Sequence, residues 1–507
     1  MKKIFKKAAG AIIAGAFLCI GMGIGMVNAY AVEINGYGIK DSPYIIQNEE
    51  QLLAMVSGEL PLDAYYKLNN NIALTTENWT PIGAFSGSFD GNDYTISNLN
   101  IESNAAYVGL FSQNDGVIKN LKVRAVSINE TVESKSCVGV IAGCNTKTIT
   151  NCSVLGDMSC TYSSYYSYVG GITGYNSGEL TDCRSACAFT GISDYIGGIT
   201  AYSTKTGSIT GCEFTGSIGD ELTYCNVDMA GGIVGWSGSD ITECANEGNI
   251  KARGDYAGGL CGNADNCDIS LCYSVGNVEN GGYNGCKSGV LIGGMVRTNV
   301  SNCFAVGSVT NASGKSGDYA GGLVGRVYSS LFNGGNIKNC YSSCEVKGEG
   351  AARAFAENVN GTVSDCYYNS SAAGEVGDEY ALALSEEQMT EGANFASWDF
   401  ENVWAIDADV NNGLPYLRAL PNVVTLNGGS KCMQYGDVNL DGKLTAADCS
   451  VILSKVLNDA YIMLIEQQAD AANIFYGDVN ADNRLTAADS SVLLQKVLND
   501  AYIMPVE

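Results

Sequence analysis

Short apolar runs separated by glycine and polar turn residues fill most of the chain. From residue 108 to 366 two phrases recur. The first is apolar-Gly-Gly-apolar-x-Gly, and it lies at residues 169–174, 196–201, 230–235, 257–262 and 320–325, with looser copies at Val108, Val138 and Ile292. The second is a β-branched residue or leucine, one further residue, a usually polar residue and cysteine, and it lies at residues 149–152, 180–183, 209–212, 241–244, 269–272, 300–303, 337–340 and 363–366.

This repetition predicts a solenoid. The cysteines of the second phrase recur every 26 to 37 residues, and each unit offers only short strands with too few apolar residues to bury a core alone. Units stacked at about 4.8 Å per rung would bury a continuous core. We therefore predict a mainly β fold, a right-handed parallel β-helix of eight to ten rungs, with the paired glycines at its corners.

Both ends of the repeat carry sequence that predicts a cap. Asn48 has the residue type of a helix N-cap, and Gln51 follows it three places later, so a short helix is expected to cover the first rung. Behind the last rung, residues 384–389, 398–404 and 413–417 are expected to close the solenoid. Residues 419–434 are expected to form a linker, because they contain proline and paired glycines.

The repeat region, residues 33–418, resembles the GLUG-motif repeat family of bacterial surface and adhesin-like proteins. The resemblance includes Trp-Thr-Pro-Ile-Gly at 79–83, Phe-Asp-Gly-Asn at 89–92 and Ile-Lys-Asn-Leu at 118–121. It implies a β-solenoid and says little about function. Some members are joined to metallopeptidases with an HExxH motif, which this chain cannot contain because it has no histidine.

The cysteines allow two interpretations. A secreted chain with this many cysteines is typical of a disulfide framework. One cysteine per rung, at the same strand position, instead behaves as a small buried hydrophobic residue in a stack. We expect stacked free thiols, and occasional bridges between adjacent rungs remain the alternative.

Residues 1–31 have the pattern of an export signal: four lysines, an apolar stretch and Ala-Tyr-Ala at 29–31 as a cleavage site. The stretch is also long enough for an uncleaved membrane anchor. The net charge of −26 disfavours nucleic acid as a partner and suits calcium-rich exterior fluid. The absence of histidine removes histidine triads and histidine general bases. We expect a secreted, extracellular protein with no membrane contact after cleavage.

Residues 435–463 and 476–504 are two copies of one segment, identical at 23 of 29 positions. Each copy opens with a loop whose oxygen-bearing residues alternate as in a calcium site, and a backbone carbonyl serves at the seventh place. Glycine at position 442 tolerates the sixth place of the first loop better than Asn483 in the second, so we expect tighter binding by the first. The predicted ligands of two Ca²⁺ ions are Asp437, Asn439, Asp441, Lys443, Thr445 and Asp448, then Asp478, Asn480, Asp482, Arg484, Thr486 and Asp489.

In a full EF-hand a helix also precedes the calcium loop, and that helix is missing here. Two such loop-helix units resemble a type I dockerin. The resemblance implies a small all-α domain of two F-hand repeats at residues 435–507, which docks onto a cohesin of a cellulosome scaffold. It also implies two docking orientations, since either copy can present the same face. The implied cohesin contacts are Ala446, Ala447, Leu453 and Ser454, or Ala487, Ala488, Leu494 and Gln495.

Two functions remain open for residues 32–418. One is a non-catalytic module that binds plant polysaccharide or a cell-surface glycan, for which tyrosines 162, 165, 166 and 168 could stack on sugars or else pack a loop against the solenoid. The other is a polysaccharide lyase or glycoside hydrolase, which needs paired carboxylates or acids with a basic residue. No catalytic residue is assigned. The acids and arginines that could converge are Asp228, Asp240, Asp255, Asp265, Asp268, Arg253, Arg297 and Arg326.

Overall fold

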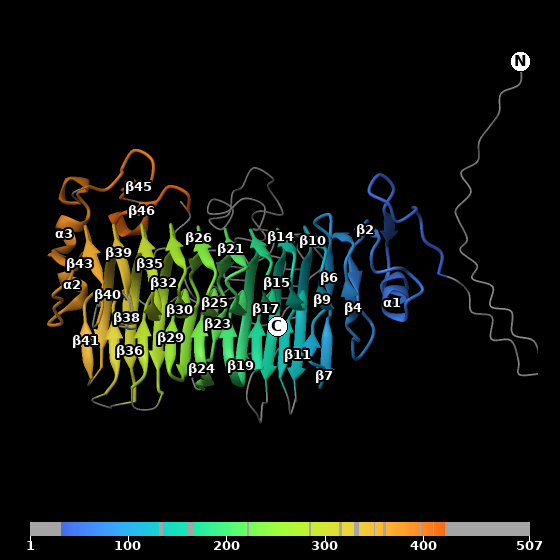
Figure 1. The fold of residues 1–507 in the computed structure, drawn as a ribbon, viewed down its shortest axis with the longest axis horizontal. Helices are drawn as coiled ribbons and strands as arrows, with labels where there is room; N and C mark the ends of the chain where they lie inside the picture. Colours follow the sequence, from blue (N-terminus) through green and yellow to red (C-terminus); the bar gives the residue numbers. More distant parts are fainter. Residues whose placement is uncertain are drawn as a thin grey trace, which may run out of the picture.

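The described chain winds into one elongated parallel β-solenoid (Figure 1). The computed structural model describes residues 32–420, except 131–134, 161–166, 221–222, 283–284, 314–316, 329–333, 349, 358–360, 396 and 409. Every strand pair of its three long sheets is parallel, as in β10 with β14 and β13 with β17. The predicted mainly β solenoid is confirmed, and its right-handedness stays a prediction.

Three sheets run the length of the solenoid. The first sheet contains β1 (Tyr44–Ile46), β2 (Tyr65–Leu68), β5 (Ser88–Asp90), β10 (Val117–Lys119), β14 (Thr148–Thr150), β18 (Glu179–Thr181), β21 (Ser208–Thr210), β26 (Asp240–Thr242), β31 (Asp268–Ser270), β35 (Thr298–Ser301), β39 (Gly335–Lys338) and β42 (Thr362–Ser364). The second sheet contains β4 (Ile82–Phe85), β9 (Phe111–Asn114), β13 (Ala142–Asn145), β17 (Thr173–Asn176), β20 (Thr200–Ser203), β25 (Val234–Ser237), β30 (Cys261–Asp265), β34 (Ile292–Val296) and β38 (Val324–Val327).

The third sheet is the widest, since a rung can contribute two or three strands to it. Its members are β3 (Ile72–Ala73), β6 (Thr95–Ser97), β7 (Asn100–Ser103), β8 (Tyr107–Val108), β11 (Lys122–Glu130), β12 (Ser136–Gly139), β15 (Ser153–Cys160), β16 (Ser167–Gly170), β19 (Arg184–Gly197), β22 (Glu213–Phe214), β23 (Ser217–Ile218), β24 (Cys225–Gly231), β27 (Ala245–Asn246), β28 (Asn249–Arg253), β29 (Tyr256–Gly258), β32 (Tyr273–Asn280), β33 (Lys287–Gly289), β36 (Phe304–Asn311), β37 (Tyr319–Gly321), β40 (Tyr341–Lys347), β41 (Ala351–Arg353), β43 (Tyr367–Asn369) and β44 (Leu382–Leu384).

One rung shows how the two sequence phrases make the corners. The chain runs from β14 in the first sheet to β15 and β16 in the third, then to β17 in the second and on to β18. The paired glycines, Gly170 and Gly171, lie at the corner between β16 and β17, as predicted. A Cβ on Gly171 would lie 2.2 Å from the carbonyl oxygen of Gly198, so the close approach of neighbouring corners requires glycine there.

The second phrase makes the corner between the first and third sheets. The residue before each cysteine has left-handed backbone angles, as at Asn151 with φ 49° and Asp182 with φ 53°. Asn and Asp adopt this conformation at a lower cost than other residues with a Cβ. The cysteine therefore follows a corner and precedes the next strand, as Cys152 precedes β15. The prediction that it sits within a strand was wrong by this one step.

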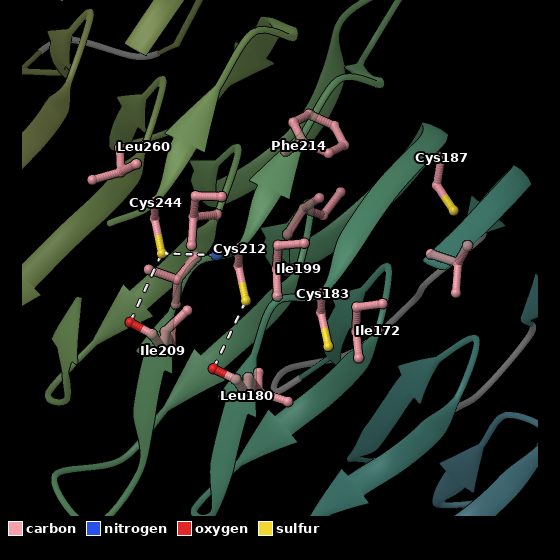
Figure 2. Packing of buried hydrophobic residues seen from close by; sticks show 14 of the residues in the cluster. Ile172, Leu180, Cys183, Cys187, Ile199, Ile209, Cys212, Phe214, Cys244 and Leu260 are labelled. Carbon is pink, nitrogen blue, oxygen red and sulfur yellow. Dashed lines mark hydrogen bonds between the residues drawn. The ribbon is translucent and has the colours of Figure 1, made fainter. Parts of the chain in front are cut away.

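The cysteines line the interior of the solenoid in a row (Figure 2). Cys183, Cys212 and Cys244 are each fully buried among inward-facing Ile and Leu side chains. The Cys212 Sγ donates to the carbonyl oxygens of Thr210 and Leu180, at 3.5 and 3.8 Å. The sixteen cysteines with described side chains are all free and buried, which agrees with the thiol interpretation for this part of the chain.

A second internal row is polar. The Asn114 amide donates to the Oδ1 of Asn145 at 2.8 Å, and the Asn145 amide donates to the Oδ1 of Asn176 at the same distance. The Asn176 amide continues the row to the Ser203 hydroxyl at 3.0 Å. All four side chains are buried, so each rung satisfies the polar group of the next and the row fixes the parallel register.

A helix covers the first rung, as predicted. The helix α1 (Glu49–Ser57) begins after Asn48, whose Oδ1 accepts from the Gln51 backbone N–H at 3.1 Å. It buries Leu52 and Met55, and it ends before Gly58 in the left-handed conformation. Among the residues that the structure describes, no helix has both the length and the apolar character needed to cross a bilayer.

The closing segment does more than cover the last rung. It contains α2 (Ser370–Ala373), α3 (Glu386–Met389), the short helices η1 (Gly392–Asn394) and η2 (Asn411–Gly413), and the antiparallel pair β45 (Trp404–Ala405) and β46 (Tyr416–Leu417). Figure 1 shows the β45–β46 pair beside the strands instead of beyond the last one. The expected closing segment therefore also forms a flap that packs on the outer side of the third sheet.

This flap lies on a row of stacked rings, here called the covered ladder: Tyr273, Phe304 and Tyr341. Adjacent ring centroids are 5.0 and 5.2 Å apart, with interplanar angles of 13° and 1°. Trp404 packs against the last two rings and is fully buried. The Tyr341 hydroxyl donates to the Pro415 carbonyl oxygen at 2.7 Å and accepts from the Asn411 amide at 2.6 Å, which ties the flap to the ladder.

Candidate functional site

A second row of outward rings follows the Gly-Gly corners in the middle of the solenoid. Tyr175, Tyr202 and Trp236 are paired in register on β17, β20 and β25, and we call them the open ladder. Tyr175 and Tyr202 are 5.6 Å apart at 5°, and Tyr202 and Trp236 are 4.4 Å apart at 12°. All three side chains are half-buried, in contrast to the fully buried Phe304 and Tyr341 of the covered ladder.

The corner brings rings of the third sheet against this ladder. A Cβ on Gly174 would lie 2.5 Å from the Tyr168 carbonyl oxygen, so only glycine lets β17 lie this close to β16. The Tyr168 ring therefore reaches within 5.3 Å of the Tyr202 ring, and Tyr195 meets Tyr202 edge to face at 6.0 Å. The result is an aromatic cluster built from two sheets, in which Tyr168 is buried and Tyr175, Tyr195 and Tyr202 are partly exposed.

A cationic cluster adjoins the open ladder on the following rungs. The register continues from Trp236 through Asn263 and Gly294 to Arg326. The Arg326 guanidinium lies 4.0 Å from the Tyr319 ring centroid, and Lys287 Nζ lies 4.7 Å from that of Tyr256.

Burial lowers the pKa of Lys287, and the Asp255 carboxylate partly offsets this effect. Burial raises the pKa of the Tyr175 and Tyr202 hydroxyls, so these rings stay neutral over the ordinary pH range.

Two polar atoms in this area are buried without a hydrogen-bond partner among the described residues: the Asn263 Oδ1 and the Arg326 Nε. A Cβ on Gly294 would lie 2.6 Å from the Tyr256 ring and 3.2 Å from the Asn263 Oδ1, so this glycine leaves room for both groups. An acceptor and a donor therefore lie on the same register row as the stacked rings.

Only part of the predicted tyrosine cluster can be placed. Tyrosines 162, 165 and 166 lie outside the described residues, and Tyr168 is packed among other rings as a mostly buried side chain. The open ladder itself was missed by the sequence interpretation. The sequence contains the pattern that would have located it. A copy of the Gly-Gly phrase is directly followed by each of these residues: Tyr175, Tyr202, Trp236 and Arg326.

The structure brings together only part of the acids and arginines of the enzyme hypothesis. Burial, and then the neighbouring Asp194 and Asp255 carboxylates, raise the pKa of Asp228, while Asp255 and Arg326 both lie near Lys287. Other members lie elsewhere. Arg297, just after β34, forms an ion pair at 2.5 Å with Asp265, the last residue of β30. Asp240 accepts from the Asp268 backbone N–H at 2.9 Å along the first sheet. The remaining members lie on or beside the strands of the third and second sheets: Asp228, Asp255, Arg253 and Arg326. Arg253 lies over the Tyr224 ring, at 5.1 Å from its centroid.

The predicted calcium ligands and cohesin contacts lie between residues 437 and 495, outside the described residues, as does the predicted export signal at 1–31. Comparison with known families identifies a domain in this C-terminal segment. Residues 435–498 match the family model of the dockerin type I domain. The chain carries a type I dockerin domain. This match spans both calcium-loop sequences of the duplicated segment.

Other similarities are weaker. An alignment 137 residues long to Halomucin from Haloquadratum walsbyi has 30% identity and covers 24% of this chain and 2% of that relative. A solved structure of a Bacteroides ovatus protein assigned as an immunoglobulin A1 protease aligns at 16% identity and a TM-score of 0.29, over 76% of this chain and 94% of that one. An IgA1 protease aligns at 13% identity and a TM-score of 0.35, over 70% of this chain and 24% of that one. These values are too low to assign a shared fold or activity.

Proposed function

We propose that this protein is a secreted component of a cellulosome-type assembly, which docks through its calcium-loaded C-terminal domain onto a cohesin of a scaffold protein. The solenoid is its cargo, a non-catalytic module that binds polysaccharide or a cell-surface glycan outside the cell. The observation that carries the docking function is the dockerin type I match over residues 435–498. The GLUG-like repeat phrases are consistent with binding at a cell surface, and they do not identify the ligand.

The donor set of the two loops fits calcium. The ligands proposed for the first loop are carboxylate, amide, hydroxyl and backbone carbonyl oxygens, from Asp437, Asn439, Asp441, Lys443, Thr445 and Asp448. The second loop offers the equivalent atoms from Asp478, Asn480, Asp482, Arg484, Thr486 and Asp489. Hard cations prefer such oxygens. Without metal the carboxylates of one loop repel one another, so calcium binding supplies part of the folding free energy of the domain.

The near-identity of the two copies supports docking in either of two orientations. Each copy has one alanine pair directly before its last predicted ligand and two further proposed contact positions after it: Ala446, Ala447, Leu453 and Ser454, or Ala487, Ala488, Leu494 and Gln495. A cohesin can then contact one copy while the other faces solvent. The two loops differ in calcium affinity, since Asn483 adopts the backbone conformation of the sixth place less easily than glycine.

Capture of the full chain on beads coated with a type I cohesin tests the docking function. We expect capture in calcium and release by a chelator, because the fold of the docking domain depends on the metal. Replacing both first ligands, Asp437→Ala with Asp478→Ala, should abolish capture, whereas either single change should leave it largely intact. Asp41→Ala, an exposed acid far from the tail in sequence, is the matched control. Unchanged capture of the double variant would refute the proposal.

A further inference from the structure

We propose that the flap acts as a strap: it joins five rungs at the C-terminal end of the solenoid into one unit that opens together, and it anchors the docking tail, residues 421–507, to that unit. The role of the tail rests on the proposed docking function, whereas the strap is argued from contacts within residues 245–420. A stack of repeats alone does not provide such coupling, because each rung contacts only its neighbours.

The last strand of the third sheet is weakly held. Among the described strands, β44 pairs with β43 alone, through three residue pairs between Leu382–Leu384 and Tyr367–Asn369. Its first residue, Leu382, is 65% exposed. The stability of a stack is a sum of rung terms and neighbour terms, so an end rung can open while the others stay closed. A solenoid that ended at β44 would therefore be expected to fray from this end.

The flap packs across five successive rungs instead of one. The residues beneath it are in register from strand to strand: Ala245 on β27, Tyr273 on β32, Phe304 on β36, Tyr341 on β40 and Tyr367 on β43. All five are buried in one apolar cluster with residues of the flap: Met389, Phe395, Trp398, Trp404, Leu414 and Leu417. One segment of chain thus removes apolar surface from water on all five rungs.

Two tryptophans of the flap each contact more than one rung. The Trp404 ring centroid lies 6.2 Å from that of Phe304 and 6.1 Å from that of Tyr341. The Trp398 ring centroid lies 6.2 Å from that of Tyr341 and 5.7 Å from that of Tyr367. The two indoles stack on each other, at 4.3 Å and 25°. Opening any one of these three rungs would expose a tryptophan that also covers its neighbour, so their openings are coupled.

The tail leaves the described structure from the part of the flap that is tied to the solenoid. Leu417 is fully buried in the apolar cluster, and Leu420 packs against the same cluster. The Tyr341 hydroxyl donates to the Pro415 carbonyl oxygen at 2.7 Å, five residues before Leu420. A pull on the tail is therefore transmitted to β40, inside the stack, and not only to the weakly held β44.

Native-state hydrogen exchange of the full chain, followed by mass spectrometry at increasing urea, tests the strap. In the wild type we expect the amides of β32, β36, β40 and β43 to open with one free energy and one urea dependence, because they open as a unit. In Trp404→Ala this unit should split, so that β43 and β40 exchange faster than β36 and β32. Tyr341→Phe keeps the ring contacts and removes only hydrogen bonds, so it should speed exchange of all four strands equally.

Trp236→Ala is the matched control, because it removes a tryptophan that lies outside the flap contacts, and it should leave exchange of the four strands unchanged. Graded exchange from β43 to β32 in the wild type, or four strands that still open together in Trp404→Ala, would overturn the inference. Circular dichroism shows whether each variant is folded. If Trp404→Ala is not, Tyr341→Phe decides, since unequal exchange of its four strands would also overturn the strap.

The test separates the strap from the docking function. Capture by a cohesin depends on the C-terminal domain and should be the same for all these variants. A chain that no cohesin captures would count against docking and leave the exchange pattern as it is, whereas loss of the common opening would count against the strap alone.

Discussion

The two aromatic ladders of this solenoid have similar geometry and opposite surroundings. In the covered ladder the rings of Phe304 and Tyr341 stack at 5.2 Å and lie under Trp404 with no exposed surface. In the open ladder Tyr202 and Trp236 stack at 4.4 Å and remain partly exposed. The difference shows that stacking on successive rungs is a property of the parallel register, whereas burial depends on whether another segment lies over the row.

This comparison concerns how much each row contributes to stability. A ring buried under the flap contributes the free energy of removing its whole apolar surface from water. A partly exposed ring removes less apolar surface from water and contributes less. The same kind of side chain therefore stabilises the fold to a different extent at the end of the solenoid and in its middle.

The largest expected effect is the loss of Trp404. Trp404→Ala should destabilise the flap by about 3–5 kcal/mol, because it empties a large buried site between Phe304, Tyr341 and Trp398. Trp236→Ala should cost about 1 kcal/mol, as expected of a partly exposed side chain. Native-state hydrogen exchange of the amides in residues 386–420 measures the destabilisation of the flap by Trp404→Ala. Urea unfolding then compares the free energy of unfolding of the two variants. Equal costs for the two variants would contradict the distinction between the ladders.

A smaller effect is expected from one hydroxyl. Tyr341→Phe keeps the ring but removes the group that bonds Pro415 and Asn411, at 2.7 and 2.6 Å, so it should cost about 1–3 kcal/mol in the same urea experiment. The matched change in the open ladder, Tyr202→Phe, should lie within about 0.5 kcal/mol of the wild type. If Tyr202→Phe proved the more costly, the open ladder would be part of the scaffold.

Much of the fold was predictable from the sequence. The Gly-Gly phrase marked the corner at Gly170 and Gly171, and the cysteine phrase marked the buried row, because each depends on residues close together in the chain. The N-cap at Asn48 was likewise local. The dockerin match at residues 435–498 agrees with the duplicated loops, while their individual ligands stay predictions.

The missed features depend on contacts between distant residues. The flap lies over Ala245 and Tyr273, more than 100 residues before Trp398 in the chain, and no local pattern states which outer face a closing segment will cover. The open ladder depends on register between rungs of unequal length, 27 residues from Tyr175 to Tyr202 and 34 from Tyr202 to Trp236. Alignment of the residues that follow each Gly-Gly phrase would have found it.

The chain has four tryptophans, which makes fluorescence quenching by acrylamide the most direct test of the distinction between the ladders. Trp79, Trp398 and Trp404 are 1%, 7% and 0% exposed, whereas Trp236 is partly exposed. We expect one quenchable component, which disappears in Trp236→Phe because Trp236 is the partly exposed member of the four. A quenchable component that persists in Trp236→Phe, or equal quenching of all four tryptophans in the wild type, would contradict the account.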